Sequence, residues 1–341
     1  MTIDVETHGS PNRCMPQRQL AVVIVHTWAP KANAHNYQQI CARGLGNDIE
    51  VHEVRVAGFD AVRRAAEEAV QAGASLIIAV GGDGTVNAVI NGMGTSSARL
   101  IVLPGGTGNC LNYQVGQGTD AAVIAATMSQ FVEVKIDTLR ANGHRFLLGA
   151  NLGVIAEINA MINRWRAKKG LAKRFFTALG EFIYVLAIWL VWLHPRRIGG
   201  RVRIEYRDLK DNATKRLELD ASSVDLFCSP TLGAGAAPLL PFSVMDDGKF
   251  EVTVWTRMNS SRLLKFLMSI GKGLQFSMPE ATTFQTDYCE IECEHPMAVF
   301  LDGEPTQLAI LYRYEIDPHP IHMMVPKGEH PGLSKRLPAN S

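Results

Sequence analysis

The chain has 341 residues, of which 47% are hydrophobic and 20% are charged, and this balance excludes a disordered protein. The 34 Lys and Arg residues nearly cancel the 33 Asp and Glu residues, so the net charge of +1 offers no overall attraction for nucleic acid. No stretch supplies the ~20 uninterrupted apolar residues of a membrane span, and the N-terminus lacks the apolar core of a secretory signal. The irregular spacing of the cysteines favours reduced thiols, so we expect a cytoplasmic protein. The length of the chain predicts about two domains.

The first part of the chain alternates between strand and helix patterns after a polar segment, residues 1–18, that we expect to be a flexible tail. Apolar or alternating runs predict strands at Leu20–Val25, Glu50–Val56, Leu76–Val80 and Arg99–Leu103. Helical patterns fill the intervals at His35–Arg43, Ala61–Ala72 and Thr85–Met93. Because strands that alternate with helices form parallel sheets, residues 19–131 predict an α/β domain.

The pattern changes near residue 132, where short β-like stretches follow one another. Turn residues such as Asn142-Gly143 and Asp247-Gly248 separate these stretches and favour hairpins. We therefore expect residues 132–316 to form a mostly antiparallel β-sandwich domain, interrupted by a helical insertion at about 157–193. For the C-terminal segment 317–341, packing back onto the first domain is left open.

Two glycine-rich loops follow neighbouring predicted strands of the first domain. They are Gly81-Gly82-Asp83-Gly84-Thr85-Val86-Asn87 and Pro104-Gly105-Gly106-Thr107-Gly108-Asn109. The carboxyl ends of parallel strands are where open α/β sheets bind ligands, and glycines let backbone N–H groups approach a phosphate. The hydroxyls of Thr85 and Thr107 can donate to phosphate oxygens, while the Asp83 carboxylate indicates a Mg²⁺ ion or a proton transfer. The alternative is a pair of ordinary turns.

Two acidic turns stand out in the second half of the chain. Asp302-Gly303-Glu304 follows the apolar stretch MAVFL, and two carboxylates at the end of a strand can serve as a base in a cleft. Asp246-Asp247-Gly248 precedes the stretch FEVTVW and offers hard oxygen ligands. Solvated turns are the alternative interpretation of both.

Four segments together resemble one family. The loop GGDGTVNAVING at 81–92 is similar to the nucleotide loop shared by several kinase families, while PGGTGN at 104–109 and LDGEP at 301–305 resemble its lipid-kinase branch. NLGVIAEIN at 151–159 resembles the start of that branch's β domain. The chain is identified as a member of the diacylglycerol kinase catalytic-domain family, of the bacterial diacylglycerol and sphingosine type. The resemblance implies a nucleotide-binding domain, a β-sandwich domain and ATP bound between them.

The same resemblance implies roles for single residues. It places ATP on the two loops, that is, on Gly81, Gly82, Asp83, Gly84, Thr85, Val86, Asn87, Gly105, Gly106, Thr107, Gly108 and Asn109. It gives acid–base work to the turn at 302–304, with Glu304 as proton acceptor and Asp302 as its neighbour or a metal partner. Asp83 is a third candidate for the base, and the sequence does not decide among the three.

Resemblance also implies a metal and a head-group site. Mg²⁺ is expected on the Asp247 carboxylate and the carbonyls of Val244 and Lys249, where a plain hairpin turn is the equal alternative. Glu157, with Asn159, is expected to engage the lipid head group, although a surface charge on a helix explains Glu157 as well.

Residues 160–207 form a strongly basic segment, with eleven basic residues against two acidic ones in a chain whose net charge is +1. Between the basic clusters lies the apolar run Phe182–Leu193, whose twelve residues span about 18 Å as a helix and are too short to cross a bilayer. An apolar helix flanked by cations suits an anionic membrane surface, so we expect peripheral membrane association. A helix buried in the second domain is the alternative.

We therefore expect an ATP-dependent lipid kinase that uses Mg²⁺ and transfers the γ-phosphate to a hydroxyl of a diacylglycerol, a sphingoid base or a ceramide-like lipid. The alternatives are a kinase of a soluble acceptor such as NAD and a catalytically inactive membrane adaptor. No nucleic-acid partner is expected. The sequence chooses neither the lipid nor the oligomeric state, a homodimer included.

Overall fold

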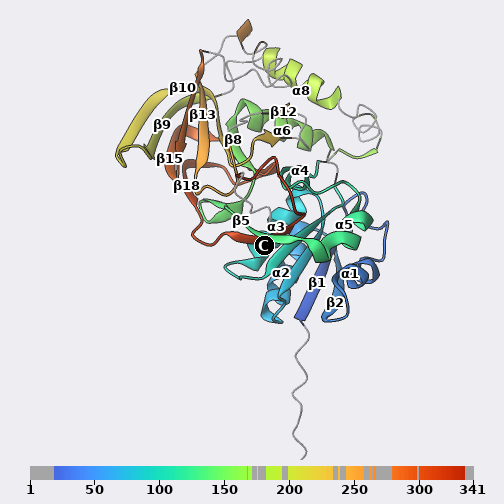
Figure 1. The fold of residues 1–341 in the computed structure, drawn as a ribbon. Coiled ribbons are helices and arrows are strands. Elements are labelled where there is room, and N and C mark those ends of the chain that lie inside the picture. Colours follow the sequence, from blue (N-terminus) through green and yellow to red (C-terminus); the bar gives the residue numbers. More distant parts are fainter. Residues whose placement is uncertain are drawn as a thin grey trace, which may run out of the picture.

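The computed structural model places an α/β domain below a β domain in the view of Figure 1. The structure describes residues 19–106, 108–166, 168–170, 175, 182–193, 199–232, 237–238, 243–256, 261–262, 265, 279–297 and 299–334. The predicted tail 1–18, Thr107, parts of the helical insertion and residues 335–341 lie outside this set.

The first domain is built on a six-stranded sheet with the order β2-β1-β3-β4-β19-β5. Its strands are β1 (Gln19–His26), β2 (Ile49–Val56), β3 (Leu76–Gly81), β4 (Arg99–Pro104), β5 (Val132–Ile136) and β19 (Ile321–Val325). Its helices are α1 (Tyr37–Leu45), α2 (Phe59–Gln71), α3 (Asp83–Met93), α4 (Cys110–Gln114), α5 (Ala121–Thr127) and the 3₁₀ turn η1 (Met128–Gln130). Strands β1 to β4 are parallel, as the alternating pattern predicted.

Helices cover both faces of this sheet (Figure 1). Side chains of α2 and α3 pack with Val22 and Ile24 of β1 in one core, while side chains of α1 and α5 pack with Ala21 and Val23 in another. Alternate residues of one strand therefore enter different cores, and both sets must be apolar. This explains the uninterrupted apolar runs in β1, β3 and β4.

The sheet is completed by segments from both sides of the second domain. Among the described strands, the edge strand β5 pairs with β19 alone, antiparallel and with Val134 opposite Met323. β19 in turn pairs with β4 in parallel. The sequence prediction started the second domain at residue 132, but the strand Val132–Ile136 belongs to the first sheet. The C-terminal strand supplies its partner, so the chain enters and leaves the second domain from the same sheet.

The second domain is an eleven-stranded antiparallel sheet. Its strands are β6 (Leu139–Ala141), β7 (His144–Phe146), β8 (Gly149–Gly153), β9 (Gly200–Arg207), β10 (Thr214–Phe227), β13 (Phe250–Thr256), β14 (Ala281–Thr286), β15 (Tyr288–Met297), β16 (Val299–Leu301), β17 (Glu304–Pro305) and β18 (Ala309–Ile316). A short separate pair is formed by β11 (Thr231–Leu232) and β12 (Ala237–Pro238). The predicted fold class, a parallel α/β domain followed by an antiparallel β domain, is confirmed.

The long strand β10 joins two parts of this sheet. Its first half pairs with β9, and a register shift between Ala221 and Ser223 precedes a second half that pairs with β8 and β13. Such a bulge bends a strand, so the sheet curls around its apolar core. The predicted hairpin at Asn142-Gly143 is present between β6 and β7, and both residues have the positive φ of a type I′ turn, 47° and 91°.

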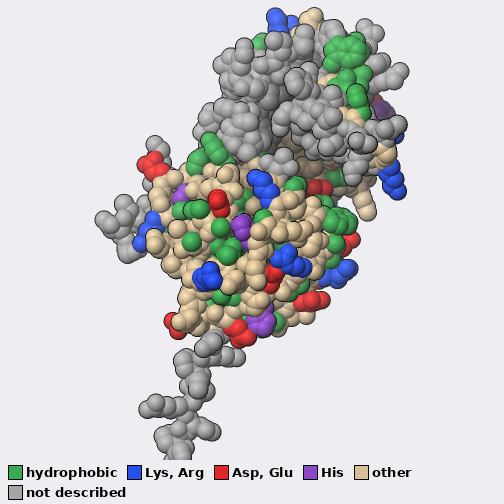
Figure 2. Space-filling view, turned by 90° about the vertical axis from the view of Figure 1, so that its right-hand side faces the viewer, with side chains coloured by type: hydrophobic (Ala, Val, Ile, Leu, Met, Phe, Trp, Pro, Cys, Tyr) green, Lys and Arg blue, Asp and Glu red, His purple; other side chains and the backbone are tan. Residues whose placement is uncertain are grey.

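Two helices of the insertion are described, α6 (Val154–Arg166) and α8 (Phe182–Leu193). Ile183, Ala187 and Val191 lie at a helical spacing and pack against α6 and Trp255, whereas Trp189 is 52% exposed on another face of α8. Figure 2 shows hydrophobic side chains at the top of the molecule, at the height of α8, above a first domain of mixed charge. Among the described helices, none combines the length and apolarity that a membrane crossing needs.

Candidate active site

The two glycine-rich loops meet backbone to backbone at the carboxyl ends of β3 and β4. Gly105 donates its N–H to the carbonyl of Gly81 at 2.8 Å. A Cβ atom placed on Gly106 would lie 2.5 Å from the Cα of Gly82, which no real side chain tolerates. Glycine is therefore required at 106 because another backbone occupies the space of a side chain.

Asp83 joins the two loops through its side chain. Its carboxylate accepts the N–H groups of Cys110 and Leu111, both at 3.1 Å, at the start of α4. These N–H groups have no partner within their own helix, so Asp83 acts as a cap supplied from a distant loop. The sequence proposed Asp83 for a cation or a proton transfer, and the structure shows that both of its oxygens already hold α4 in place.

Thr85 is buried behind the first loop, not exposed toward a ligand. Its hydroxyl lies 2.9 Å from Nδ1 of His26, and Gly58 donates its N–H to Nε2 of the same ring at 3.3 Å. Because Nε2 accepts, Nδ1 carries the proton and donates to Thr85. Burial lowers the pKa of His26, in agreement with a neutral ring. The Thr85 hydroxyl thus already has a partner within the protein, and its contact with a phosphate stays a prediction.

The second loop is held by its own asparagine. Asn109 adopts a left-handed conformation with φ of 47°, accepts the N–H of Gly106 at 3.1 Å and donates to the carbonyl of Gly106 at 2.9 Å. Val86 belongs to the core of the first domain. What the loops can offer a ligand is therefore chiefly backbone at the very start of α3, because the N–H groups of Thr85 and Val86 already donate to the Gly82 carbonyl at 2.9 and 3.1 Å.

Asp302 is the anchor of the acidic turn. Its carboxylate accepts the N–H groups of Leu147, Leu148 and Gly149 at 2.9, 2.7 and 3.1 Å, and the side-chain amide of Asn87 at 2.9 Å. Burial raises the pKa of Asp302, and these four donors oppose that shift because they favour the ionised form. With its acceptor sites in use, Asp302 serves to fix the turn against α3 and β8.

Glu304 extends from this fixed turn over the start of α3. Its Oε1 lies 2.8 Å from the position that a Cβ on Gly84 would take, so Gly84 leaves the space in which this carboxyl sits. Burial and the charge of Asp302 raise the pKa of Glu304. A carboxyl with a raised pKa beside an anion-binding helix terminus is suited to accept a proton from a hydroxyl.

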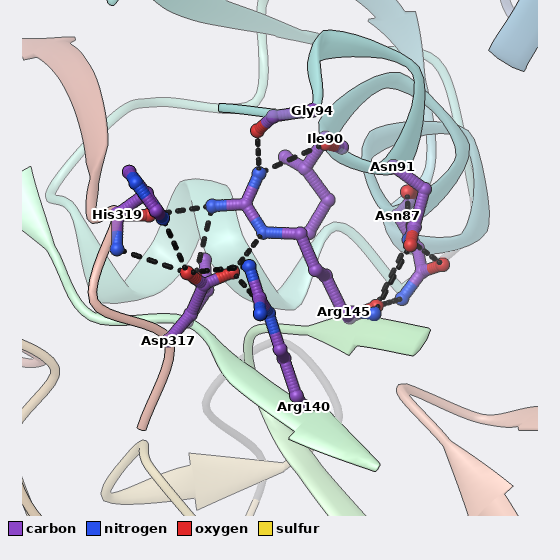
Figure 3. Close-up of polar contacts among 9 residues, drawn as sticks. Asn87, Ile90, Asn91, Gly94, Arg140, Arg145, Asp317 and His319 are labelled. Carbon is purple, nitrogen blue, oxygen red and sulfur yellow. Dashed lines mark hydrogen bonds and ion pairs between the residues drawn. The ribbon is translucent and has the colours of Figure 1, made fainter. Parts of the chain in front are cut away.

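A buried arginine connects this arrangement to the junction between the domains (Figure 3). The carbonyl of Arg145 accepts the side-chain amides of Asn87 and Asn91 at 3.2 and 2.9 Å. Its guanidinium donates to the carbonyl of Ile90 at 3.2 Å and to that of Gly94, at the other end of α3. Arg145 of β7 therefore contacts α3 at several points from Asn87 to Gly94, the residue that follows the helix.

Asp317, in the segment between β18 and β19, pairs with two arginines of the second domain. We call the group of Arg140, Arg145 and Asp317 the clasp. The buried Asp317 carboxylate lies 2.6 Å from Nε of Arg145 and accepts two hydrogen bonds from Arg140, at 3.0 and 3.1 Å. Burial alone would raise the pKa of Asp317, but the His319 N–H and the two arginines together lower it. The clasp spans both crossings between the domains, so it sets the position of Glu304 relative to α3.

Aromatic side chains that sequence reasoning missed lie beside His26, whose ring contacts Thr85 of α3. Trp28, after β1, is 70% exposed, and Phe59, at the start of α2, is 41% exposed. Both rings lie beside His26, with centroid distances of 5.9 and 5.1 Å, and Phe59 also reaches the position of a Cβ on Gly84. Exposed aromatics directly after two neighbouring parallel strands were the available hint. Such faces can bind a planar ring.

The predicted head-group residues lie on α6. Glu157 is half-exposed and pairs with Arg164 at 2.9 Å, and Asn159 is partly buried. This ion pair within one helix agrees with the surface-charge interpretation, and a role in head-group binding stays a prediction.

The predicted metal turn contains a cation of the protein itself. The ammonium of Lys249 lies 3.3 Å from the Asp247 carboxylate, which also accepts the N–H of Lys249 at 3.2 Å. Within the described ranges, no three or more His, Cys, Asp or Glu side chains form a cluster that could hold a metal ion. The expected donor set has only one carboxylate beside the carbonyls of Val244 and Lys249, so a Mg²⁺ ion at this turn stays a prediction.

Much of the local positive charge near residue 200 is neutralised across the strands. Arg201 pairs with Glu218, and Arg207 pairs with Asp287. Arg203 contacts Glu292 at 2.7 Å. Because these partners lie outside residues 160–207, the charge counted from that segment overstates the free positive surface.

Comparison with family models agrees with this architecture. The model described as "Diacylglycerol kinase catalytic domain" matches residues 20–141, and that of the "YegS C-terminal NAD kinase beta sandwich-like domain" matches residues 150–325. The chain belongs to the diacylglycerol kinase family. Family membership assigns it to the kinases, which transfer phosphoryl groups. The two matched models leave residues 142–149 between them, and Arg145 lies in this interval.

Individual members of the diacylglycerol kinase family match most of the chain. A diacylglycerol kinase of Bacillus subtilis is 28% identical over 290 residues, which cover 83% of this chain and 87% of the relative. A Stenotrophomonas maltophilia protein named probable lipid kinase YegS-like is 29% identical over 307 residues, covering 84% and 89%. The crystal structure of a diacylglycerol kinase from Bacillus anthracis has a TM-score of 0.65 at 18% identity and covers 91% and 97%, which supports the fold.

Proposed function

We propose that the chain is an ATP-dependent lipid kinase in which Glu304 accepts the proton of the lipid hydroxyl. One observation carries this proposal: the Glu304 carboxyl, with its raised pKa, lies over Gly84 at the start of α3, where the two glycine loops meet. A helix N-terminus framed by glycines favours phosphate groups. A base at the same place can act on a hydroxyl that approaches the terminal phosphate.

The reaction would proceed by displacement at the γ-phosphorus. The hydroxyl oxygen of the acceptor forms a bond to this phosphorus, the bond to the oxygen shared with the β-phosphate breaks, and the hydroxyl proton passes to Glu304. Asp302 holds the turn that carries Glu304, and its negative charge makes Glu304 a better proton acceptor. Mg²⁺, when bound with ATP, neutralises charge on the β- and γ-phosphates.

ATP is the proposed donor because of the groups around α3. The backbone of Gly82 and Gly84 can face the phosphates, and the exposed rings of Trp28 and Phe59 offer a wall for the purine. Base stacking on aromatic side chains contributes about 1–3 kcal/mol. Family membership supports the same donor.

A lipid is the proposed acceptor because relatives that match four fifths of the chain carry the names diacylglycerol kinase and lipid kinase. A soluble acceptor such as NAD and an inactive adaptor are the alternatives. The direct test is incubation of the purified chain with a total lipid extract and γ-labelled ATP, followed by mass spectrometry of labelled products. A phosphorylated lipid supports the proposal, whereas a product formed only from NAD, or nucleotide binding without any product, contradicts it.

Peripheral binding to an anionic membrane is part of the proposal. Trp189 and Leu193 are exposed on α8, and Lys168 and Lys169 are exposed beyond the end of α6. An apolar face near cations favours the interface of an anionic bilayer. We expect co-sedimentation with phosphatidylglycerol vesicles but not with phosphatidylcholine vesicles, and a loss in Trp189→Ser but not in Trp28→Ser. Equal binding of both variants would contradict a role of α8.

A further inference from the structure

A cleft of about 470 Å³ lies beside the acidic turn, on the side of the second domain. One wall is the β6–β7 hairpin, with Asn142 and His144, and the other is formed by β16, β17 and residues 306–309. Glu304 and Asn87 stand at the inner end. The volume falls in the range of ~300–1,000 Å³ that is typical of small-molecule sites.

Glu304 belongs to both the cleft and the nucleotide loops. Its carboxyl reaches the position over Gly84 and also lines the cleft. Asn87, at the same end, donates to the Asp302 carboxylate. It also donates to the Arg145 carbonyl (Figure 3). A molecule in the cleft can thus present a hydroxyl to Glu304 while the phosphate lies at the start of α3.

Two hydroxyl groups in the walls of the cleft, those of Tyr312 and Thr306, already have hydrogen-bond partners within the protein. The Tyr312 hydroxyl is engaged by the Ala309 N–H and by the carbonyl of Met297. The Thr306 hydroxyl donates to the carbonyl of Val299 at 3.1 Å. With these hydroxyls committed within the protein, the wall of β16 to β18 is mainly apolar, while Asn142, His144 and Gln307 are polar members of the lining. The apolar wall is lined by Val299, Leu301, Pro305, Leu308, Ala309 and Tyr312.

The mouth of the cleft is marked by exposed apolar side chains. Leu308, which lines the cleft, is 65% exposed, and Pro305 beside it is exposed as well. Large apolar side chains that gather on a surface next to a cleft indicate a ligand or an interface. A polar inner end with a carboxyl and an apolar outer end fit an amphiphile that enters with its hydroxyl first.

We infer that this cleft holds a hydrocarbon chain of the acceptor lipid, with its hydroxyl at Glu304 and the chain leaving past Leu308. The inference rests on the proposed function and adds the place of the acceptor to it. The acyl-chain length that contributes to recognition is then set at least in part by residues 299–312.

Two substitutions test the cleft. Ala309→Trp fills it from the half-buried wall, and Leu308→Ser removes the apolar mouth at an exposed position. The matched control is Val123→Ser, an exposed apolar residue of α5 in the first domain. The measurement is kcat/KM for a long-chain diacylglycerol in mixed micelles and for dihexanoylglycerol, which has the same head group. ATP hydrolysis without acceptor and thermal unfolding report on the nucleotide site and the fold.

We expect Ala309→Trp to lower kcat/KM for the long-chain acceptor at least about tenfold, and Leu308→Ser to lower it less, while ATP hydrolysis stays as in the control. The short-chain acceptor should be affected less by both. Unchanged long-chain kinetics in both variants, or equal losses for both acceptors, would overturn the inference.

A second measurement separates this inference from the proposed function. A diacylglycerol with a photoreactive diazirine in its acyl chain is irradiated with the wild-type chain, and the labelled residues are located by mass spectrometry. Labels within 299–312 support the cleft even if no acceptor is phosphorylated, in which case the proposed function alone fails. Labels confined to other segments overturn the cleft even if the chain is an active lipid kinase.

Discussion

The two domains contribute to the candidate site in different ways. The first domain supplies backbone: Gly82 and Gly106 touch along their main chains, and the side chains of Thr85 and Asn109 are used to hold the loops. The second domain supplies a carboxyl, Glu304, on a turn that Asp302 fixes with four accepted hydrogen bonds. In the proposed function, the first domain offers its backbone to the phosphates and the second domain brings a base to them.

Because the two domains contribute backbone and a carboxyl respectively, substitutions in each should affect a different step of the proposed reaction. Changes in the glycine loops alter the space for the donor, while changes in the acidic turn alter proton transfer, and changes in the clasp alter how the two parts meet. The following variants separate these three contributions.

The largest expected effect is on catalysis by Glu304→Gln, which keeps the shape of the side chain but removes the proton acceptor. We expect phosphoryl transfer to fall about 10²–10⁴-fold with nucleotide affinity retained. Glu292→Gln, in an exposed ion pair on β15, is the matched control. Steady-state kinetics and calorimetric titration with ATP measure the two quantities, and loss of ATP affinity with little loss of turnover would contradict the assignment.

The pH dependence gives an independent check of the same residue. Because the pKa of Glu304 is raised, the wild-type rate should fall on acidification through a value above 4.5, as the base becomes protonated. The rate–pH profile of Glu304→Gln should lack this limb. An identical limb in both proteins would assign it to another group.

The next effect is on stability, from Arg145→Met. The substitution removes one of the two arginines that pair with the buried Asp317 carboxylate, while Arg140 keeps its hydrogen bonds to it. It also leaves the carbonyls of Ile90 and Gly94 without the guanidinium, so we expect a cost of about 3 kcal/mol. Arg216→Met, in an exposed pair with Glu205, should change the free energy of unfolding by about 1 kcal/mol or less. Denaturant unfolding measures both. The double variant Arg145→Met with Asp317→Asn should recover part of the loss.

Acid unfolding tests the other half of the clasp. The folded-state pKa of Asp317 lies below its ordinary value of 3.8, so its contribution to stability is present above that pH. It is lost as the pH falls further, through the folded-state pKa. Asp317→Asn should be less stable near neutral pH and should lack this acid-dependent component, which midpoints of unfolding between pH 2 and pH 6 would reveal.

A smaller effect is expected from Gly106→Ala, whose Cβ would force the two loops apart. A displacement of the reacting groups by about 1 Å can lower the rate about a hundredfold, and we expect ATP affinity to fall together with turnover. Gly118→Ala, where a Cβ meets nothing within 4 Å, is the control. Wild-type kinetics in Gly106→Ala would mean that the loops do not need their close contact.

The smallest effect concerns the aromatic wall. Trp28→Leu and Phe59→Leu should each weaken ATP binding by about 1–3 kcal/mol, the usual contribution of stacking on a base. Trp189→Leu on α8 removes an exposed aromatic far from the loops and should leave ATP binding unchanged. Titration with ATP and with inorganic triphosphate separates the base from the phosphates, because only ATP binding should respond.

The sequence predicted the parts of this site that depend on local pattern. The apolar runs located β1, β3 and β4, and the glycines after β3 and β4 located the loops, because glycine is needed wherever another backbone comes close. The partners of the side chains could not be found in this way. Asp83 caps a helix 27 residues away in the chain, and Asp317 meets Arg145 across 172 residues. Such pairs are fixed by how the domains are joined, and no periodicity records them.

The return of the chain to its first sheet has a consequence for synthesis. Among the described strands β5 pairs with β19 alone, so residues 132–136 cannot take this place in the sheet until residues 321–325 have left the ribosome. During synthesis, the edge of β4 that later pairs with β19 therefore stays unpaired while the second domain is translated. A chain that is truncated before residue 321 should therefore carry both glycine loops on a sheet that lacks β19 and β5.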